Sequence, residues 1–146
     1  MIISCARSLS NINRILVVDD VADNLFLIQM VLEAEGYQVE VVDSGKAALA
    51  KIEQKSPDLM LLDIMMPGMN GYEVARHIRQ NSNLPYIPII MISGCEQTDE
   101  FQGFETLTEA FIPKPIDFDK LLYQIRAISA TTVSEISDRA SLQVAS

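Results

Sequence analysis

The chain has few of the features that mark a membrane protein, a disulfide-rich protein or a DNA-binding protein. No apolar run approaches the roughly 20 residues that a membrane-spanning helix needs. The two cysteines, Cys5 and Cys95, lie far apart and outside any CxxC or histidine spacing, which argues against a zinc site and a disulfide framework. Lys and Arg number 11 against 20 Asp and Glu, and the net charge of −9 argues against direct binding to DNA, which needs a basic surface.

The two ends of the chain show little sign of regular structure. Residues 1–13 lack the charged and long apolar regions of a signal peptide, so we expect a flexible leader. Residues 130–146 are polar and rich in Ser and Thr, which predicts a largely disordered tail. One domain is therefore expected, over residues 14–129, with no room for a separate output domain. We expect a stand-alone cytoplasmic protein with reduced thiols and no membrane contact.

Short apolar runs alternate with segments of helical periodicity within this domain. Five runs bounded by turn residues predict buried strands, at Arg14–Val18, Gln38–Val42, Leu59–Leu62, Pro88–Ile92 and Ala110–Ile112. Apolar residues at helical spacing predict a helix after each strand, at Asp23–Glu35, after the caps Ser44 and Asn70, at Glu96–Leu107 and at Asp117–Ser129. This alternation is typical of an α/β fold, and right-handed crossovers restrict it to a doubly wound parallel sheet.

The stretch Pro57–Gly71 combines the central predicted strand with a carboxylate and a loop. Asp63 follows the apolar run Leu59–Leu62 directly, and proline and glycine residues then break regular structure. Burial disfavours an ionised carboxylate, so a charge held at this position needs a cation or hydrogen-bond donors beside it. Taken alone, Asp63 is more simply explained as the cap of its own turn.

Polar side chains follow three other strands as well. Asp19 and Asp20 come after the first strand, Ser93 after the fourth and Lys114 after the fifth. In a doubly wound sheet the carboxyl ends of the strands share one edge, where ligands bind. Each residue alone has an ordinary explanation as a turn, cap or surface residue. Their joint placement with Asp63 predicts a site.

The residue types at this edge suit phosphoryl transfer to a carboxylate. Three carboxylates repel one another unless a cation lies among them, and oxygen ligands suit Mg²⁺. We therefore expect Asp19 and Asp20 to hold Mg²⁺ and Asp63 to be the nucleophile. Lys114 would offset charge on the transferred group, and Ser93 would donate to one of its oxygens.

Four segments closely resemble the receiver domain of two-component response regulators. They are Ile15–Asp20, Leu61–Gly71, Ile89–Ser93 and Phe111–Pro115, and the resemblance covers residues 14–129. It implies a flavodoxin-like fold, with five parallel strands in the order 2-1-3-4-5 and five helices. It also implies a protein that takes a phosphoryl group from a sensor histidine kinase or a phosphotransfer protein. Such a protein is not an enzyme beyond its own phosphorylation and dephosphorylation.

The resemblance implies a metal site and an acceptor. Asp63 matches the phosphoacceptor. Asp19 and Asp20, together with Asp63 and the backbone carbonyl of Met65, match the groups that bind Mg²⁺.

The resemblance also implies a switch. Ser93 and Lys114 match the residues that hold the phosphoryl group, and Phe111 matches an aromatic residue that moves inward on activation. The Lys114–Pro115 peptide bond is expected to be cis. The fourth helix, fifth strand and fifth helix would then present a changed surface to a downstream protein. Acidic residues from Glu96 to Glu109 and the basic Lys120 and Arg126 could also pair across a homodimer.

Two positions depart from the family pattern. Leu107–Ala110 replaces a Gly-Ala-Asp-Asp-like turn, and Gly94 stands where alanine is usual. His77, the only histidine, lies beside a helical apolar stripe and is expected to be a solvated residue rather than a phosphate carrier.

Two other functions compete with that of a phosphorylated receiver. A degenerate receiver would bind partners without phosphorylation, and the complete acidic set argues against it. A Mg²⁺-dependent aspartyl-phosphate phosphatase usually needs a general acid at position 65, where methionine cannot serve. Met65 and Cys95 flank the path of an attacking water and cannot orient it, so we expect slow self-dephosphorylation.

Overall fold

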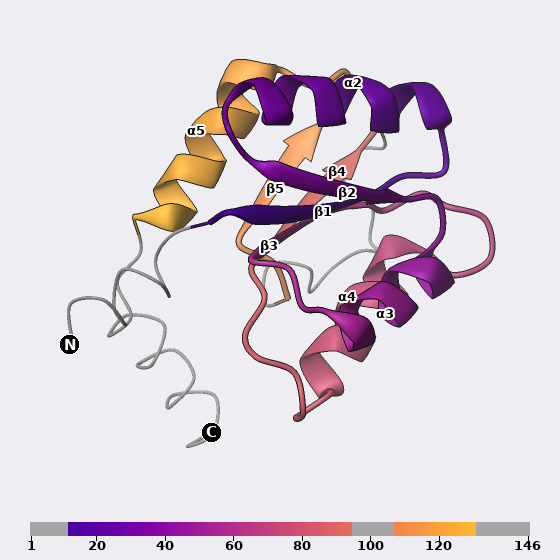
Figure 1. Cartoon of the computed structure of the whole chain (residues 1–146). Coiled ribbons are helices and arrows are strands. Elements are labelled where there is room, and N and C mark those ends of the chain that lie inside the picture. The colour runs from indigo at the N-terminus through magenta and orange to yellow at the C-terminus, as the bar shows by residue number, and fades with distance from the viewer. Residues whose placement is uncertain (1–11, 95–106, 131–146) are drawn as a thin grey trace, which may run out of the picture.

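The computed structural model describes residues 12–94 and 107–130 of the protein (Figure 1). These ranges contain five strands and four helices. The strands are β1 (Arg14–Val18), β2 (Gln38–Val42), β3 (Leu59–Asp63), β4 (Ile89–Ser93) and β5 (Ala110–Pro113). The helices are α2 (Ala22–Ala34), α3 (Gly45–Gln54), α4 (Gly71–Gln80) and α5 (Phe118–Ser129).

The strands form one parallel sheet in the order β2-β1-β3-β4-β5, which confirms the predicted topology. β3 lies at the centre and is bonded to β1 on one side and β4 on the other. Every residue of β3 and β4 is buried, as expected for strands that read as continuous apolar runs. The strand order reverses between β1 and β3, so the carboxyl ends of these two strands border the crevice where such sheets bind ligands.

Helices cover both faces of the sheet (Figure 1). On one face, α2 contributes Leu25, Ile28 and Leu32 and α5 contributes Leu121 and Ile125 to an apolar cluster with β1, β3 and β4. On the other face, α3 and α4 pack against the alternate side chains of the same strands, with Ala48, Ile52, Val74 and Ile78 buried. Apolar clusters on both faces therefore hold the sheet in place. They also fix the positions of the residues at its carboxyl edge.

Short polar side chains cap the N-termini of three helices. The Ser44 and Asn70 side chains accept hydrogen bonds from Ala47 and Glu73 backbone N–H groups, which confirms both as caps. Asp117 caps α5 in the same way. Gly36, just beyond α2, has a φ of 96°, which residues with a Cβ rarely adopt.

Three strands, β3, β4 and β5, extend one residue beyond the predicted ends. Asp63 and Ser93 are the last residues of β3 and β4 rather than the first residues after them. The ladder continues because Ile64 N–H donates to the Ile92 carbonyl at 3.0 Å. Both polar side chains are therefore held by strand backbone, not by a loose turn.

Several expectations concern residues outside the described ranges. These are the leader, the tail and most of the predicted helix Glu96–Leu107. None of the helices in residues 12–94 and 107–130 has the length and apolarity that a bilayer crossing requires.

Candidate functional site

The carboxyl ends of β1, β3 and β5 bring three carboxylates and one ammonium group to the same edge of the sheet. Asp19, Asp20 and Asp63 each offer a carboxylate oxygen, and these oxygens lie within 4.8 Å of one another. Asp19 and Asp63 are each 2% exposed, whereas Asp20 is exposed. The structure thus gathers the acidic residues that the sequence predicted to form one site.

Asp63 ends the central strand, and its carboxylate has a partner on each oxygen. Oδ1 accepts a hydrogen bond from the Met65 backbone N–H at 3.2 Å, and Oδ2 lies 3.4 Å from the Lys114 Nζ. Burial and the nearby charge of Asp19 raise the pKa of Asp63 from 3.8 to about 6, although Lys114 opposes the shift. Burial and Asp19 therefore disfavour the ionised form of Asp63 more than Lys114 favours it.

Lys114 follows β5 and bridges the two buried carboxylates. Its Nζ lies 3.1 Å from the Asp19 Oδ2 and 3.4 Å from the Asp63 Oδ2. Burial acts to lower the pKa of Lys114, but the hydrogen bond to Asp19 and the charges of both carboxylates together raise it, so the side chain stays cationic. Its backbone N–H donates to the Ser93 carbonyl at 2.8 Å. The Lys114–Pro115 peptide bond is cis.

Asp19 has more partners than Asp63 does. Its Oδ1 accepts from the Val21 backbone N–H at 2.9 Å, and its Oδ2 accepts from the Asn24 Nδ2 at 3.3 Å as well as from Lys114. Sequence reasoning missed Asn24. The available signal was a polar side chain in the first turn of a mostly apolar helix, directly after the acidic pair.

Ser93 and Phe111 lie on the two strands beside Lys114. Ser93 is 1% exposed, and its register partner on β5 is Pro113, the residue before Lys114. Phe111 is half-buried and packs against the apolar cluster that contains Met91, its register partner on β4. Both residues therefore lie in the strands whose ends border the acidic site.

The start of α4 approaches the end of β3 very closely. A Cβ on Gly71 would lie 2.3 Å from the carbonyl oxygen of Asp63, a contact that no side chain could make. The Gly71 N–H donates to the Ile64 carbonyl at 2.9 Å and closes the loop. At Gly94, by contrast, a Cβ would make only an ordinary contact of 3.7 Å with Lys114. Steric contacts therefore do not require a glycine at position 94.

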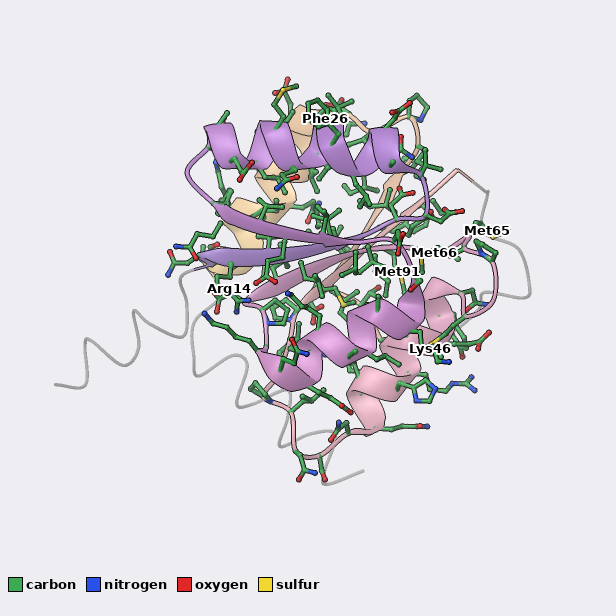
Figure 2. The ribbon with its side chains drawn as sticks, turned by 45° about the vertical axis from the view of Figure 1, so that its right-hand side comes forward. Arg14, Phe26, Lys46, Met65, Met66 and Met91 are labelled. Atoms are coloured by element: carbon green, nitrogen blue, oxygen red, sulfur yellow. The ribbon has the colours of Figure 1, made fainter. Side chains whose placement is uncertain are left out.

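In the loop after β3, the Met65 side chain is exposed to solvent and the Met66 side chain is buried (Figure 2). The Met65 side chain is 50% exposed, two residues beyond Asp63, whereas Met66 is 7% exposed and belongs to the core cluster below. The side chain two residues beyond Asp63 is therefore apolar and accessible.

The donor set fits a small hard cation. Oxygen ligands suit Mg²⁺, and this edge of the sheet offers carboxylate oxygens from Asp19, Asp20 and Asp63. Lys114 places one ammonium group beside these three carboxylates, so it balances only part of their negative charge. A divalent cation would supply that balance.

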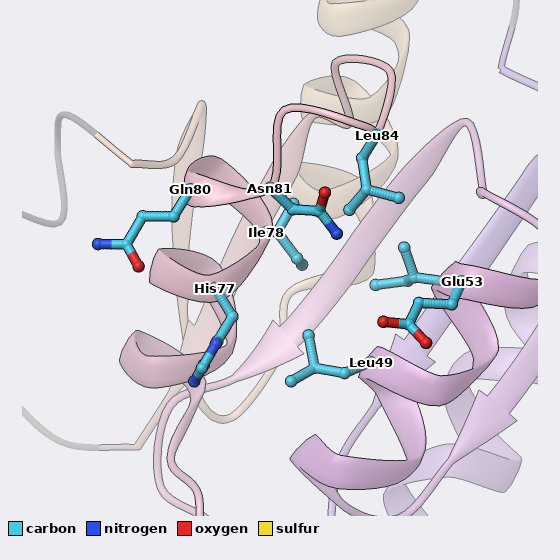
Figure 3. Close-up of a pocket in the computed structure, with 8 residues that line it drawn as sticks. Leu49, Glu53, His77, Ile78, Gln80, Asn81 and Leu84 are labelled. Atoms are coloured by element: carbon cyan, nitrogen blue, oxygen red, sulfur yellow. The ribbon is translucent and has the colours of Figure 1, made fainter.

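His77 lies apart from this edge, as predicted. It is exposed on α4 and lines a cavity of about 270 Å³ between α3 and α4, with Leu49 and Glu53 opposite (Figure 3). None of the acidic site residues lines this cavity. His77 is therefore a solvated helix residue within the described structure.

Glu109 does not belong to an exposed acidic surface, contrary to the grouping made from the sequence. Its side chain is 10% exposed and accepts hydrogen bonds from the Ile89 N–H at 2.6 Å and from Arg79 at 3.4 Å. Arg79 also donates to the Leu107 carbonyl at 2.9 Å and the Ile87 carbonyl at 2.7 Å. The unusual segment before β5 is thus anchored at the edge opposite the acidic site.

Comparison with known proteins places this geometry in a family. The family model described as the response regulator receiver domain matches residues 15–126. The response regulator PleD of Caulobacter vibrioides is 38% identical over 117 residues, which cover 80% of this chain and 26% of PleD. Protein PilH of Pseudomonas aeruginosa is 34% identical over 118 residues, which cover 80% of this chain and 98% of PilH. The chain thus spans about a quarter of PleD but nearly all of PilH.

A solved structure agrees in fold. The response regulator protein TrrA of Thermotoga maritima, in complex with Mg²⁺-BeF, matches with a TM-score of 0.72 and 31% identity, covering 80% of this chain and 98% of TrrA. The family model, these relatives and the 2-1-3-4-5 sheet all agree. The chain therefore belongs to the receiver domains of response regulators, the signalling modules of two-component systems.

Proposed function

We propose that the protein accepts a phosphoryl group on Asp63 from a sensor histidine kinase or a phosphotransfer protein, and that the phosphorylated form binds a downstream protein. The observation that carries this proposal is the placement of Asp63. It ends the central strand with 2% exposure, 3.4 Å from Lys114 and within reach of two further carboxylates. Receiver domains are signalling modules rather than enzymes, so the only chemistry proposed is the gain and loss of this group.

The transfer is a single displacement at phosphorus. An Asp63 carboxylate oxygen attacks the phosphorus of a phosphohistidine, and an O–P bond forms while the N–P bond breaks. The histidine nitrogen leaves with the electron pair of the broken bond. Lys114, beside Oδ2, offsets charge on the transferred group. The Met65 N–H holds Oδ1 and so limits rotation of the attacking carboxylate.

Mg²⁺ completes the proposed site. Asp19, Asp20 and Asp63 would hold it, together with the backbone carbonyl of Met65. When bound, it would neutralise charge on the phosphoryl oxygens. The gathered carboxylate oxygens support this assignment.

The proposed switch uses the strands that border Lys114. After transfer, Lys114 and the Ser93 hydroxyl hold the phosphoryl oxygens, and Phe111 moves into the space behind Ser93. The surface of β5 and α5 then changes for a downstream partner, together with the predicted helix 96–107, most of which lies outside the described residues. The burial of Ser93 and the half-burial of Phe111 support these roles.

The phosphodonor is proposed to dock on the outer face of α2, next to the site. This helix has apolar residues on its exposed side as well as its buried side. Phe26, Leu27 and Met30 are 67%, 44% and 51% exposed, and Val21, the residue before the helix, is 46% exposed. Such a patch is typical of a protein-binding surface. Leu27 also lines a cavity of about 490 Å³ with Lys114, Pro115 and Phe118, so the patch continues to the acidic site. Figure 2 shows Phe26 on this helix.

The remaining parts of the proposal concern partners and place. A cytoplasmic location without direct DNA contact is proposed, and the net charge of −9 supports the latter. A homodimer through β5, α5 and the predicted helix 96–107, most of which lies outside the described residues, is also proposed. Within one chain, Glu109 pairs with Arg79, and Arg126 lies 3.4 Å from Glu35. Sedimentation with and without a phosphoryl mimic tests the dimer, and an unchanged monomer would rule it out.

Intact mass measurement tests the function. The protein is incubated with Mg²⁺ and acetyl phosphate, beside Asp63→Asn and the exposed control Asp43→Asn. We expect one alkali-labile phosphoryl group on the wild type and on Asp43→Asn, none on Asp63→Asn, and none when EDTA removes Mg²⁺. A wild type that binds Mg²⁺ but gains no mass, from acetyl phosphate or from a phosphorylated phosphotransfer protein, would favour the degenerate receiver. Turnover of an added phosphate ester would favour the phosphatase.

A further inference from the structure

Asn24 is a neutral side chain that donates a hydrogen bond to the acidic site. It lies in the first turn of α2, and its Nδ2 is 3.3 Å from the Asp19 Oδ2. It also lines the cavity that Lys114 and Pro115 border. The side chain therefore lies between the proposed docking face of α2 and the buried carboxylate of Asp19.

The donors around Asp19 differ in what they can do during the reaction. The Val21 N–H on Oδ1 is backbone and fixed. On Oδ2, Lys114 at 3.1 Å is shared, because the same Nζ lies 3.4 Å from Asp63. Asn24 is not shared with Asp63 in the contacts of the described residues. Lys114 can therefore move toward Asp63, whereas Asn24 contacts only Asp19 of the two carboxylates.

Phosphorylation changes the competition for Lys114. A phosphoryl group adds negative charge and acceptor oxygens at Asp63, so it draws the ammonium group away from Asp19. Asp19 is 2% exposed, and a buried carboxylate that loses its partner is strongly disfavoured. A neutral amide can replace the lysine as a donor without cancelling the negative charge that a cation needs.

We propose that Asn24 is a positioning residue that holds the Asp19 carboxylate when Lys114 moves to the phosphoryl group. The inference rests on the proposed function, since it assumes that Lys114 serves Asp63 after transfer. While Lys114 remains on Asp19, the amide and the lysine share the task. Once Lys114 has left, Asn24 and the Val21 N–H hold Asp19 in place for the metal.

The test is a double-mutant cycle read by calorimetric titration of Mg²⁺ into the unphosphorylated protein. Asn24→Leu is made in the wild type and in Lys114→Ala. In the wild type, where Lys114 still holds Asp19, we expect Mg²⁺ affinity to fall about threefold or less. In Lys114→Ala the same change should weaken Mg²⁺ binding about tenfold or more, in the range that partners of metal ligands show. Equal factors in the two backgrounds would overturn the proposal.

Two further variants separate positioning from general loss of stability. Asn24→Gln keeps an amide donor and should recover at least part of the affinity that Asn24→Leu loses in Lys114→Ala. Gln29→Leu removes an amide from the same helix away from the site and should leave both affinities unchanged. A loss in Gln29→Leu equal to that in Asn24→Leu, or no recovery in Asn24→Gln, would show that the effect is structural and would overturn the proposal.

A second measurement does not require a change at Lys114. Beryllofluoride with Mg²⁺ is titrated into the wild type and Asn24→Leu. We expect beryllofluoride affinity to fall about tenfold, more than Mg²⁺ affinity alone, because Lys114 is engaged elsewhere in that complex. Equal losses would count against the proposal. If the wild type accepts neither phosphoryl group nor beryllofluoride, the proposed function fails, whereas the Mg²⁺ cycle still decides the role of Asn24.

Discussion

The buried negative charge of Asp63 should make the metal-free protein less stable than a variant that lacks it. Burial and Asp19 raise the pKa of Asp63 from 3.8 to about 6 in the folded state. A shift of roughly two units corresponds to about 3 kcal/mol of unfolding free energy lost once the carboxyl is ionised. Asp63→Asn, which carries no charge, should recover about 2 to 3 kcal/mol of this at pH 8 in EDTA.

The raised pKa of Asp63 also predicts how the free energy of unfolding changes with pH. The unfolded carboxyl ionises near 3.8 and the folded one near 6, so between these values the folded state binds more protons. The stability of the wild type therefore falls as pH rises through this window, while that of Asp63→Asn does not. The difference between them should be small near pH 4, should grow up to about pH 6 and should stay constant above it.

Urea unfolding followed by far-ultraviolet circular dichroism measures this difference, because the chain has no tryptophan. The exposed Asp43→Asn serves as the control and should change stability little at any pH. Millimolar Mg²⁺ should remove most of the advantage of Asp63→Asn, because the cation binds the ionised wild type and stabilises it. A gain that is equal at pH 4.5 and pH 8, or a variant less stable than the wild type at pH 8, would refute the reasoning.

Three further predictions follow from the site and its surroundings. Met65→Asn should shorten the lifetime of the phosphorylated protein several-fold, because an amide can orient an attacking water beside Asp63. Loss of the phosphoryl mass over time measures this lifetime, and an unchanged lifetime would contradict the prediction. Phe26→Asp should slow transfer from phosphorylated phosphotransfer proteins at least tenfold but leave transfer from acetyl phosphate unchanged, whereas Tyr123→Asp, equally exposed on α5 at 68%, should affect neither; equal slowing with both donors would argue against docking on α2. Gly71→Ala should destabilise the protein by about 2 kcal/mol or more, because its Cβ would lie 2.3 Å from the Asp63 carbonyl oxygen, and a chemical denaturation midpoint within error of the wild type would contradict this.

Much of the fold could be predicted because the strands and helices have distinct sequence patterns. Arg14–Val18 and Gln38–Val42 match the predicted strands, and Ser44 and Asn70 cap the expected helices. The end of β3 was misplaced by one residue, because an aspartate reads as a strand terminator. Its backbone stays in the ladder while its side chain is held by Met65 N–H and Lys114.

The site could be predicted in part. Asp19, Asp20, Asp63 and Lys114 each follow or end a strand, so topology alone brings them together. Asn24 could not be predicted in this way, because its contact depends on how α2 is rotated over the sheet.

The pairing of Glu109 with Arg79 was missed for a similar reason. It depends on a long-range contact between the end of α4 and the residue before β5, which sequence spacing does not report. Counting acidic residues between Glu96 and Glu109 therefore overestimated the exposed negative charge of that segment, because Glu109 is mostly buried.

The central claim is that Asp63 itself carries the phosphoryl group, and one measurement tests it most directly. The protein is phosphorylated with Mg²⁺ and a phosphodonor, reduced with borohydride, which converts an acyl phosphate to an alcohol, and digested for peptide sequencing by mass spectrometry. The account predicts homoserine at position 63 and at no other aspartate, and none when EDTA is present during phosphorylation. Homoserine at Asp19 or Asp20, or a phosphorylated protein with an unmodified Asp63, would contradict it.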